Sequence, residues 1–310
     1  CNGERSMLHN RSNLMATLRA SALALSALLI VSPAQAAKSA NYAGHAKAQE
    51  FVDKMVKEGF ERPYLEQLMA AAQRQESILK AISKPAERRL DWGQYRKIFL
   101  GTKRIDQGVE FWEKHQATLQ RASELYGVEA EIIVAIIGVE TRYGRHAGKY
   151  KVVDALATLA FDYPPRGKFF SGQLRELLYL LKEEKLKSAE LKGSYAGAMG
   201  YGQFIPSSYR HYAVDFDGDG QRNILTNPVD AIGSVANYFK RHDWRVGQPV
   251  TFPAEVVGNI DAKLFNQQLK PKKTLSDWKA LGVKTQDVKT LNAKATANNS
   301  VSEKSLATAM

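Results

Sequence analysis

Hydrophobic positions along most of the chain recur at the spacing of an α-helix. In the first such stretch the repeat is broken at Gly59 and Pro63, which predicts two short amphipathic helices. A later stretch stops at Gly127, a residue type that commonly follows the end of a helix. The segments with this spacing are 49–79, 105–126, 153–161 and 170–187. The pattern therefore predicts a mainly helical protein.

One predicted helix, over residues 129–141, has no polar face through its second half. Residues 132–137 are all apolar, and Val139 continues the run. A helix that is apolar all round is expected to be buried. Glu140 stands at the end of this helix, so a carboxylate follows directly on apolar side chains.

The pattern changes toward the C-terminus. Segment 193–202 is rich in Gly and Ala, and we expect it to be irregular at first and helical only afterwards. Asn227-Pro228 places an N-cap residue before a proline at the first helical position, which predicts a further helix. Short β-like runs follow at 249–253 and 254–257, and the end of the chain is polar. The fold class is therefore mainly α with minor β.

The first 36 residues have the order of a secretory signal peptide. Arg19 precedes an apolar run over 22–31, and the small-residue sequence Ala34-Gln35-Ala36 follows it. The run is well short of the roughly 20 residues that a membrane-spanning helix needs. The only cysteine, Cys1, precedes the run, so no cysteine after it can carry a lipid or form a disulfide. We expect cleavage near Ala36 and a soluble protein of the periplasm.

The chain is strongly basic, with a formal net charge of +12. Residues 1–36 carry three arginines and one glutamate, which leaves +10 on the remainder. A basic surface concentrates anionic partners. For an exported protein we expect these partners to be the cell wall or the membrane surface. The sequence contains no motif typical of nucleic-acid binding, so we do not expect a nucleic-acid partner. Cell-wall synthesis proteins are further candidate partners.

Glu140 is the first candidate for chemistry. Burial and the end of a helix both disfavour negative charge, so both raise the pKa of this carboxyl, as a general acid near neutral pH requires. The alternative is a helix-end glutamate that forms an ion pair with Arg142 or Arg145.

The Gly/Ala-rich run from Gly193 to Phe204 interleaves small residues with aromatic and hydrogen-bonding ones. Small residues permit close backbone approach, and tyrosines offer flat faces with a polar tip, as a sugar groove requires. A phosphate-binding loop is the competing interpretation, but the run has neither its lysine nor a preceding apolar strand.

The sequence Asp215-Phe216-Asp217-Gly218-Asp219-Gly220-Gln221 matches the opening of a calcium loop, with oxygen ligands at alternate positions and glycine at the sixth. Position 12 is Thr226 where a bidentate glutamate is usual, and Asp230 is the available substitute. An acidic surface turn is the alternative. The expected calcium ligands are Asp215, Asp217, Asp219, Gln221 through its backbone carbonyl, and Asp230.

Three motifs stand out in the chain: Glu140-Thr141-Arg142-Tyr143-Gly144, the run from Gly193 through Pro206-Ser207-Ser208-Tyr209, and the acidic loop followed by residues 227–238. Together they resemble the membrane-bound lytic murein transglycosylase B family over residues 45 to 283. The resemblance implies a lysozyme-like core in which Glu140 is the sole catalytic residue and the acidic loop binds calcium. It places Ser194, Tyr195, Gln203 and Tyr238 along the sugar groove, and we assign Arg166, in the loop over 162–167, to substrate binding as well.

This resemblance sets the expected organisation. It comprises a signal peptide (1–36), an N-terminal helical region (37–128), a lysozyme-like core with the calcium loop (129–245) and a C-terminal segment with short strands and a polar tail (246–310). The family's C-terminal segment, which reaches the active site, has no evident counterpart after Val283. We therefore expect a shortened version without a lipid anchor.

The resemblance also implies a reaction. A hydrolysing glycosidase ordinarily uses two carboxylates, and the motif supplies one. In the lytic route Glu140 protonates the oxygen between N-acetylmuramic acid and N-acetylglucosamine, then accepts the proton of the muramoyl 6-hydroxyl as a 1,6-anhydro ring forms. The alternatives are a hydrolytic muramidase with Asp154 or Asp162 as second carboxylate, and a non-catalytic peptidoglycan-binding protein.

Overall fold

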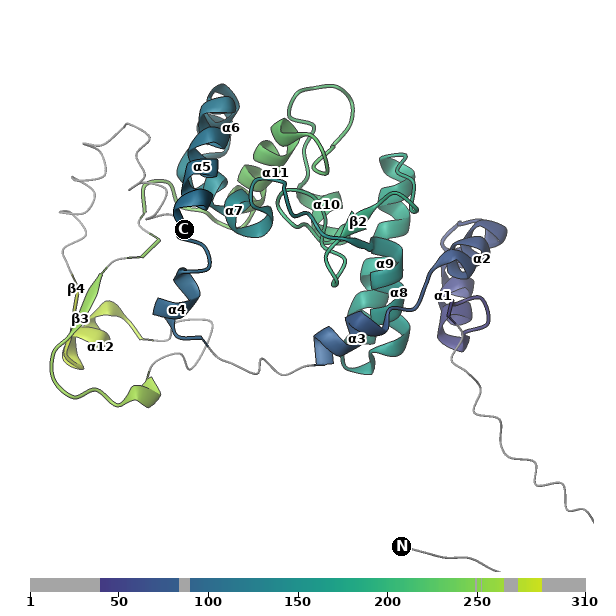
Figure 1. Cartoon of the computed structure of the whole chain (residues 1–310), viewed down its shortest axis with the longest axis horizontal. Helices are drawn as coiled ribbons and strands as arrows, with labels where there is room; N and C mark the ends of the chain where they lie inside the picture. The colour runs from purple at the N-terminus through teal and green to yellow at the C-terminus, as the bar shows by residue number, and fades with distance from the viewer. Residues whose placement is uncertain (1–39, 84–89, 249, 252, 265–272, 286–310) are drawn as a thin grey trace, which may run out of the picture. The chain divides into compact units, whose positions relative to one another are not determined.

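Almost all of the regular secondary structure in the described part of the chain is helical (Figure 1). The computed structural model describes residues 40–83, 90–248, 250–251, 253–264 and 273–285. The predicted signal peptide and the polar end therefore lie outside the described residues. The helices are α1 (Ala46–Lys57), α2 (Arg62–Ala71), α3 (Glu76–Ser83), α4 (Trp92–Arg96), α5 (Thr102–Lys114), α6 (Gln116–Tyr126), α7 (Ala130–Thr141), α8 (Val152–Asp162), α9 (Gly167–Glu183), α10 (Pro206–Tyr212), α11 (Pro228–Arg241), α12 (Leu275–Ala280) and the short 3-10 helices η1 (Pro164–Arg166) and η2 (Ala262–Leu264).

Several helix boundaries differ from the sequence prediction. The first stretch contains three helices rather than two, since α3 follows α2 after a short break. The stretch over 105–126 is divided at His115, where the backbone leaves the helical region (φ −116°, ψ 20°). On either side of this break, α5 packs against α7, and α6 packs against both α7 and α11.

The Gly/Ala-rich segment departs furthest from its prediction. It does not become helical before residue 202, and the next helix, α10, begins at Pro206. Gly197 and Gly200 have φ of 80° and 69°, a region that glycine enters without steric cost, and these values end any helical turn. An antiparallel bridge pairs Met199 with Phe204 instead.

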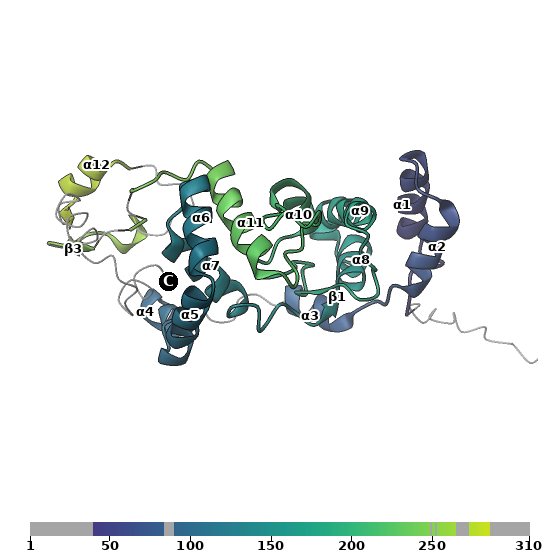
Figure 2. The same ribbon diagram turned by 90° about the horizontal axis from the view of Figure 1, so that it is seen from above.

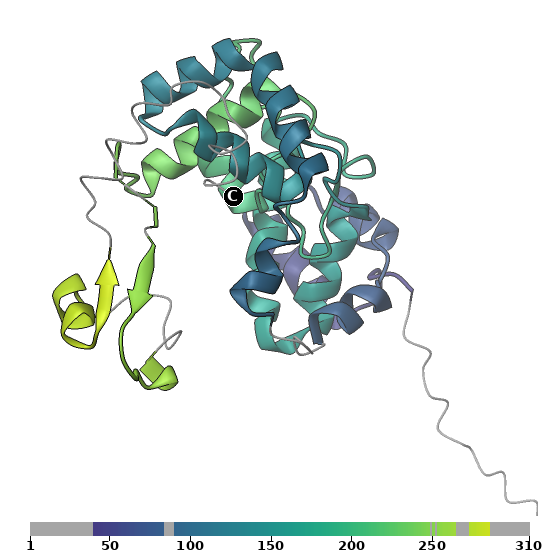
Figure 3. The ribbon, with the colours of Figure 1, turned by 60° about the vertical axis from the view of Figure 1, so that its left-hand side comes forward.

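Short antiparallel strand pairs account for the described β-structure. Strand β1 (Tyr150–Lys151) pairs with β2 (Lys192–Gly193). Strand β3 (Ala254–Val256) pairs with β4 (Val283–Thr285) (Figure 3). The strand expected over 254–257 is thus confirmed, whereas the described residues of 249–253 form none.

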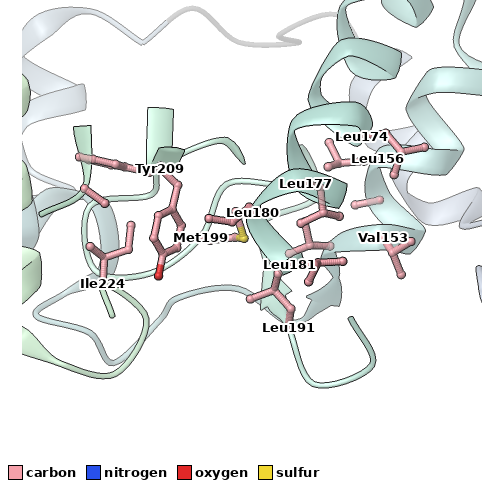
Figure 4. Packing of buried hydrophobic residues seen from close by; sticks show 14 of the residues in the cluster. Val153, Leu156, Leu174, Leu177, Leu180, Leu181, Leu191, Met199, Tyr209 and Ile224 are labelled. Carbon is pink, nitrogen blue, oxygen red and sulfur yellow. The ribbon is translucent and has the colours of Figure 1, made fainter. Parts of the chain in front are cut away.

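Helices α8 and α9 lie side by side and make the most extensive contact between helices of the described residues (Figure 2). Every residue of α8 from Val152 to Phe161 is buried, and α9 turns its leucines toward them (Figure 4). Full burial of one leucine side chain stabilises a fold by about 1.5–3 kcal/mol, whereas an exposed ion pair contributes at most about 1 kcal/mol. The leucine contact therefore outweighs ion pairs on the outer side of α9, such as Glu183 with Arg210.

The remaining contacts join two groups of helices. Helices α5, α6, α7 and α11 pack together, and α1 and α3 pack on α8. Helix α10 contacts both α9 and α11, so it links the two groups. None of the helices in the described segments has the length and apolar character that crossing a membrane requires.

Two helical glycines predict opposite responses to the same substitution. Gly172 in α9 is exposed, and nothing lies within 4 Å of an added Cβ, so Gly172→Ala should stabilise the protein by up to about 1 kcal/mol through helix propensity. At Gly233 in α11 a Cβ would lie 2.4 Å from Cγ of Phe216, so Gly233→Ala should lower the melting temperature. Thermal denaturation of the two variants beside the unaltered protein measures both. A stabilised Gly233→Ala protein would contradict the packing described here.

Candidate active site

Helix α7 ends at Thr141, and the chain reverses sharply at Arg142, two residues after Glu140. Arg142, Tyr143 and Gly144 have φ of 52°, 60° and 81°, and the left-handed region costs a residue with a Cβ about 1–2 kcal/mol. The backbone N–H groups of Arg142 and Tyr143 offset part of this cost by donating to the last carbonyls of α7.

Thr141 holds this reversal against the Gly/Ala-rich segment. Its hydroxyl Oγ1 lies 2.9 Å from the carbonyl oxygen of Tyr201 and accepts the backbone N–H of Gly144 at 2.9 Å. Thr141 itself is buried. A Cβ on Gly144 would lie 2.3 Å from the ring of Tyr201, so only glycine permits this approach. Glu140 is therefore fixed beside the Gly/Ala-rich segment.

Glu140 opens onto a pocket of about 310 Å³. The walls come from the end of α7, from the segment that precedes α10, and from α10 and α11 themselves. Most of them are apolar, and no second carboxylate is among them. The lining residues are Glu140, Gly202, Gln203, Phe204, Ile205, Ser208, Val235, Tyr238 and Phe239.

The Glu140 side chain is more accessible than the sequence analysis expected. By solvent accessibility it is exposed, because it faces the pocket, while the preceding residues Ile137 and Gly138 are buried. Enough protein still surrounds the carboxylate that desolvation raises its pKa above the usual glutamate range. The direction agrees with the requirement for a general acid.

The ion pair considered as an alternative for Glu140 is not formed. Arg142 donates to the side-chain oxygen of Gln107 at 2.6 Å, and Arg145 pairs with Glu110 at 3.4 Å. No hydrogen bond or ion pair joins the carboxylate of Glu140 to another residue in the described part of the chain. Its carboxyl group is therefore available to a ligand in the pocket.

Gln203 lines the same pocket, and its amide orientation is determined by two backbone carbonyls. Nε2 donates to the oxygen of Ala147 at 3.2 Å and to the oxygen of Gly200 at 3.1 Å. Both amide hydrogens are thereby used, which leaves the carbonyl oxygen Oε1 as the free group. Gln203 can accept a hydrogen bond from a ligand but has no N–H left to donate.

Ser194 has the opposite pattern. Its hydroxyl oxygen accepts the backbone N–H groups of Ala196 (3.3 Å) and Ala198 (3.1 Å). A hydroxyl with both lone pairs engaged retains only its hydrogen for a further partner. Ser194 does not line the pocket of Glu140, and the neighbouring Tyr195 is exposed.

Tyr238 contributes a half-buried aromatic wall from α11. Its ring stacks on His242 at a centroid distance of 4.0 Å and packs edge-on against Tyr212 at 5.0 Å. The ring thus belongs to both the pocket and an aromatic cluster, as a residue with two roles would.

Arg166 and the two alternative carboxylates lie away from the pocket lining. Arg166 is exposed at η1 and its guanidinium covers the rings of Phe169 and Phe170. Asp154 accepts the backbone N–H of Gln73, and Asp162 accepts the hydroxyl of Tyr42 at 2.8 Å. Because both aspartates are engaged outside the pocket, neither is placed as a partner of Glu140.

Six pocket residues had no individual site assignment in the sequence analysis. Ser208 adds a hydroxyl from α10, and apolar residues make up the others. All but Phe239 lie within the quoted motifs, but no chemical feature of their own marked them as lining the pocket. These residues are Gly202, Phe204, Ile205, Ser208, Val235 and Phe239.

The acidic loop brings three of its predicted ligands together. The carboxylate oxygens of Asp215, Asp217 and Asp230 lie within 4.8 Å of one another. Asp230 is buried, and its two oxygens accept the backbone N–H groups of Phe216 and Asn223, each at 2.7 Å. Burial raises the pKa of Asp230. Three clustered carboxylates of this kind suit a hard cation with oxygen ligands.

Another predicted ligand, Asp219, is not part of this group. It accepts the backbone N–H of Gln221 at 2.8 Å. Asn227 caps α11 and donates from Nδ2 to Asp217 at 2.7 Å, which lowers the pKa of that aspartate. The loop is thus bonded to the start of the helix that carries Tyr238.

Comparison with known proteins extends over most of the chain. The Transglycosylase SLT domain family matches residues 43–309, a range that includes the segment after Val283 for which we expected no counterpart. Membrane-bound lytic murein transglycosylase B of Escherichia coli strain K12 is 46% identical over 256 residues, which are 79% of this chain and 70% of that protein.

Solved structures agree with this assignment. The catenated lytic transglycosylase SltB1 of Pseudomonas aeruginosa is 50% identical with a TM-score of 0.77, over 80% of this chain and 82% of that one. Escherichia coli Slt35 in complex with calcium is 46% identical with a TM-score of 0.73 (79% and 77%). Pseudomonas aeruginosa SltB3 in complex with NAG-anhNAM-pentapeptide is 30% identical with a TM-score of 0.70 (85% and 76%). With a single carboxylate in the pocket at the end of α7, a family match over residues 43–309 and relatives that cover 79% to 85% of its length, the chain belongs to the lytic murein transglycosylases of the SLT domain family.

Proposed function

We propose that this protein cleaves the bond between N-acetylmuramic acid and N-acetylglucosamine in peptidoglycan by the lytic route, with Glu140 as acid and then base. The observation that carries the proposal is the presence of one carboxylate in the pocket, with a raised pKa and no partner among the described residues. A two-carboxylate hydrolysis would need a second group there, and Asp154 and Asp162 are engaged elsewhere.

The proposed reaction conserves atoms without water. Protonated Glu140 donates its proton to the glycosidic oxygen as the bond from that oxygen to C1 of the muramoyl residue breaks. The resulting carboxylate takes the proton of the 6-hydroxyl while the 6-oxygen forms the new bond to C1. The products are an N-acetylglucosamine hydroxyl and a 1,6-anhydromuramoyl end, and Glu140 is protonated again.

Two polar residues would recognise complementary parts of the sugars. The free Oε1 of Gln203 suits the N–H of an N-acetyl group or a sugar hydroxyl, and the free hydrogen of Ser194 suits a carbonyl oxygen. Tyr195, Tyr238 and Arg166 remain candidate groove residues in this proposal. The complex of SltB3 with NAG-anhNAM-pentapeptide supports a substrate of this class.

We also propose that the acidic loop binds calcium and that residues 1–36 direct export to the periplasm. Asp215, Asp217 and Asp230 would hold the ion, with Asp219 and the backbone of Gln221 completing the set. When bound, calcium would neutralise the clustered charge and supply no chemistry to the reaction. The calcium complex of Slt35 supports this proposal.

The first test replaces the proposed acid. Glu140→Gln keeps the shape of the side chain but cannot donate a proton as an acid, so release of anhydromuropeptides should fall by at least about 10²-fold. Mass spectrometry of products released from purified peptidoglycan measures this and separates anhydro ends from hydrolytic ones. The melting temperature at neutral pH should not fall, because the amide removes a disfavoured charge. Activity above a tenth of the unaltered protein would remove Glu140 from this role.

The pH profile tests the same carboxyl group independently. Since the protonated form starts the reaction, kcat/KM should be maximal below the pKa of Glu140 and decline as pH rises through it. Desolvation raises this pKa, so the decline should begin above the usual glutamate range of about 4.3. Initial rates from about pH 4 to pH 8 reveal the limb. A rate that increases steadily across that range would exclude Glu140 as the initial acid.

Calcium should stabilise the fold without changing the chemistry. Adding calcium to chelated protein should raise the melting temperature, since a ligand at 100 times its Kd stabilises the folded state by about 2.7 kcal/mol. Asp217→Asn should diminish the increase, whereas Asp106→Asn, an exposed aspartate of α5, should leave it unchanged. Equal melting curves with and without calcium would contradict the site.

A further inference from the structure

A pair of lysines stands directly opposite each other on the β1–β2 ribbon. In the antiparallel register Lys151 of β1 pairs with Lys192 of β2, and both side chains are exposed. Directly opposite residues have Cβ atoms about 4.5–5.5 Å apart, and like charges in this position are unfavourable. The fold therefore holds two positive charges together at a local cost.

Nothing in the described part of the chain neutralises this pair. Residues 141–153 contain no aspartate or glutamate. The acid nearest to Lys192 in sequence, Glu190, pairs with Lys187 at 3.3 Å. No ion pair involves Lys151 or Lys192 among the described residues, and Lys149 adds a third exposed cation next to Tyr150.

Both strands of the ribbon are tied to the proposed groove. On the β1 side, the carbonyl of Ala147 accepts a hydrogen bond from Gln203, which lines the pocket of Glu140. On the β2 side, Lys192 precedes Ser194 by two residues. A Cβ on Gly148 would lie 2.0 Å from the backbone of Gly193, so the two segments are in close backbone contact. The lysine pair is thus held at a definite place relative to the groove residues.

We propose that Lys151 and Lys192 form a subsite for a carboxylate of the peptidoglycan stem peptide. The inference rests on the proposed function, because the stem peptide is attached to the muramoyl sugar whose bond is cleaved. A stem peptide with a free C-terminus carries at least one carboxylate. Two adjacent ammonium groups offer charge-assisted hydrogen bonds to such a group, and its binding would relieve their repulsion.

The test compares the unaltered protein with a double lysine variant on two substrates. Purified peptidoglycan with intact stem peptides is compared with glycan strands from which an amidase has removed them, and kcat/KM is measured on each. The ratio of interest is kcat/KM on stem-bearing peptidoglycan divided by kcat/KM on stem-free strands. In Lys151→Gln/Lys192→Gln this ratio should fall about threefold to tenfold, as expected for the loss of two exposed ion pairs. The effect should disappear near 1 M salt, where screening acts over about 3 Å.

Matched controls separate this subsite from general charge and from misfolding. Lys54→Gln/Lys57→Gln removes the same charge from the last turn of α1 and should leave the ratio unaltered. Lys151→Arg/Lys192→Arg should retain the preference. The melting temperature of the glutamine variant should not fall, because a repulsive pair is removed. A ratio equal to that of the unaltered protein, or an equal fall in the α1 control, would overturn the proposal.

Failure of the proposed function would be recognised separately. Release of anhydromuropeptides by the unaltered protein tests the reaction and does not depend on the lysines. If that release is absent, pelleting with stem-bearing and stem-free material still tests the subsite. The lysine variant should then bind less of the stem-bearing material alone, and undiminished binding would refute the subsite.

Discussion

The pocket depends on the way in which helix α7 ends. If the chain continued in the direction of α7, the carboxylate of Glu140 would be either buried with the apolar side chains of the helix or fully exposed to solvent. The hydroxyl of Thr141 prevents both by bonding Tyr201 and Gly144, across a left-handed reversal that begins at Arg142. The carboxyl group of Glu140 consequently faces a partly apolar pocket in which desolvation raises its pKa.

Helix α11 connects the pocket with the acidic loop. Its first turn carries Asp230, whose carboxylate closes the loop by accepting two backbone N–H groups, and its later turns carry Val235 and Tyr238 into the pocket wall. Phe216 of the loop packs against the helix at Gly233. A cation in the loop would therefore stabilise the same helix that shapes the groove, although the ion itself lies outside the chemistry proposed here.

Hydrogen bonds to the backbone leave Gln203 and Ser194 with different free groups. Gln203 donates to the carbonyls of Ala147 and Gly200, and Ser194 accepts the N–H groups of Ala196 and Ala198, so each side chain is oriented before any ligand arrives. One acceptor on Gln203 and one donor on Ser194 remain, and in the proposed function these two groups would bind an N-acetyl substituent. Rigid placement of this kind reduces the ordering cost of binding.

The sequence by itself determined the helices, because their signal is local. Apolar spacing predicted α7, α8 and α9, Asn227-Pro228 marked the start of α11, and the spacing of aspartates identified the acidic loop. Motif resemblance identified the family, and it predicted the catalytic role of Glu140, which stays a prediction. The predicted helix boundaries were wrong where a single residue such as His115 interrupts a continuous pattern. The spacing of apolar residues does not reveal one non-helical backbone conformation.

Only the tertiary structure decided which side chains meet. Thr141 and Tyr201 are 60 positions apart, and their contact follows from the packing of whole elements rather than from any local pattern. The same packing draws Asp154 and Asp162 into bonds with the N-terminal segment, brings Ser208 and Phe239 to Glu140, and sets Lys151 opposite Lys192. Sequence spacing specifies the face that a residue occupies on its own element, whereas the partner across that face depends on long-range contacts.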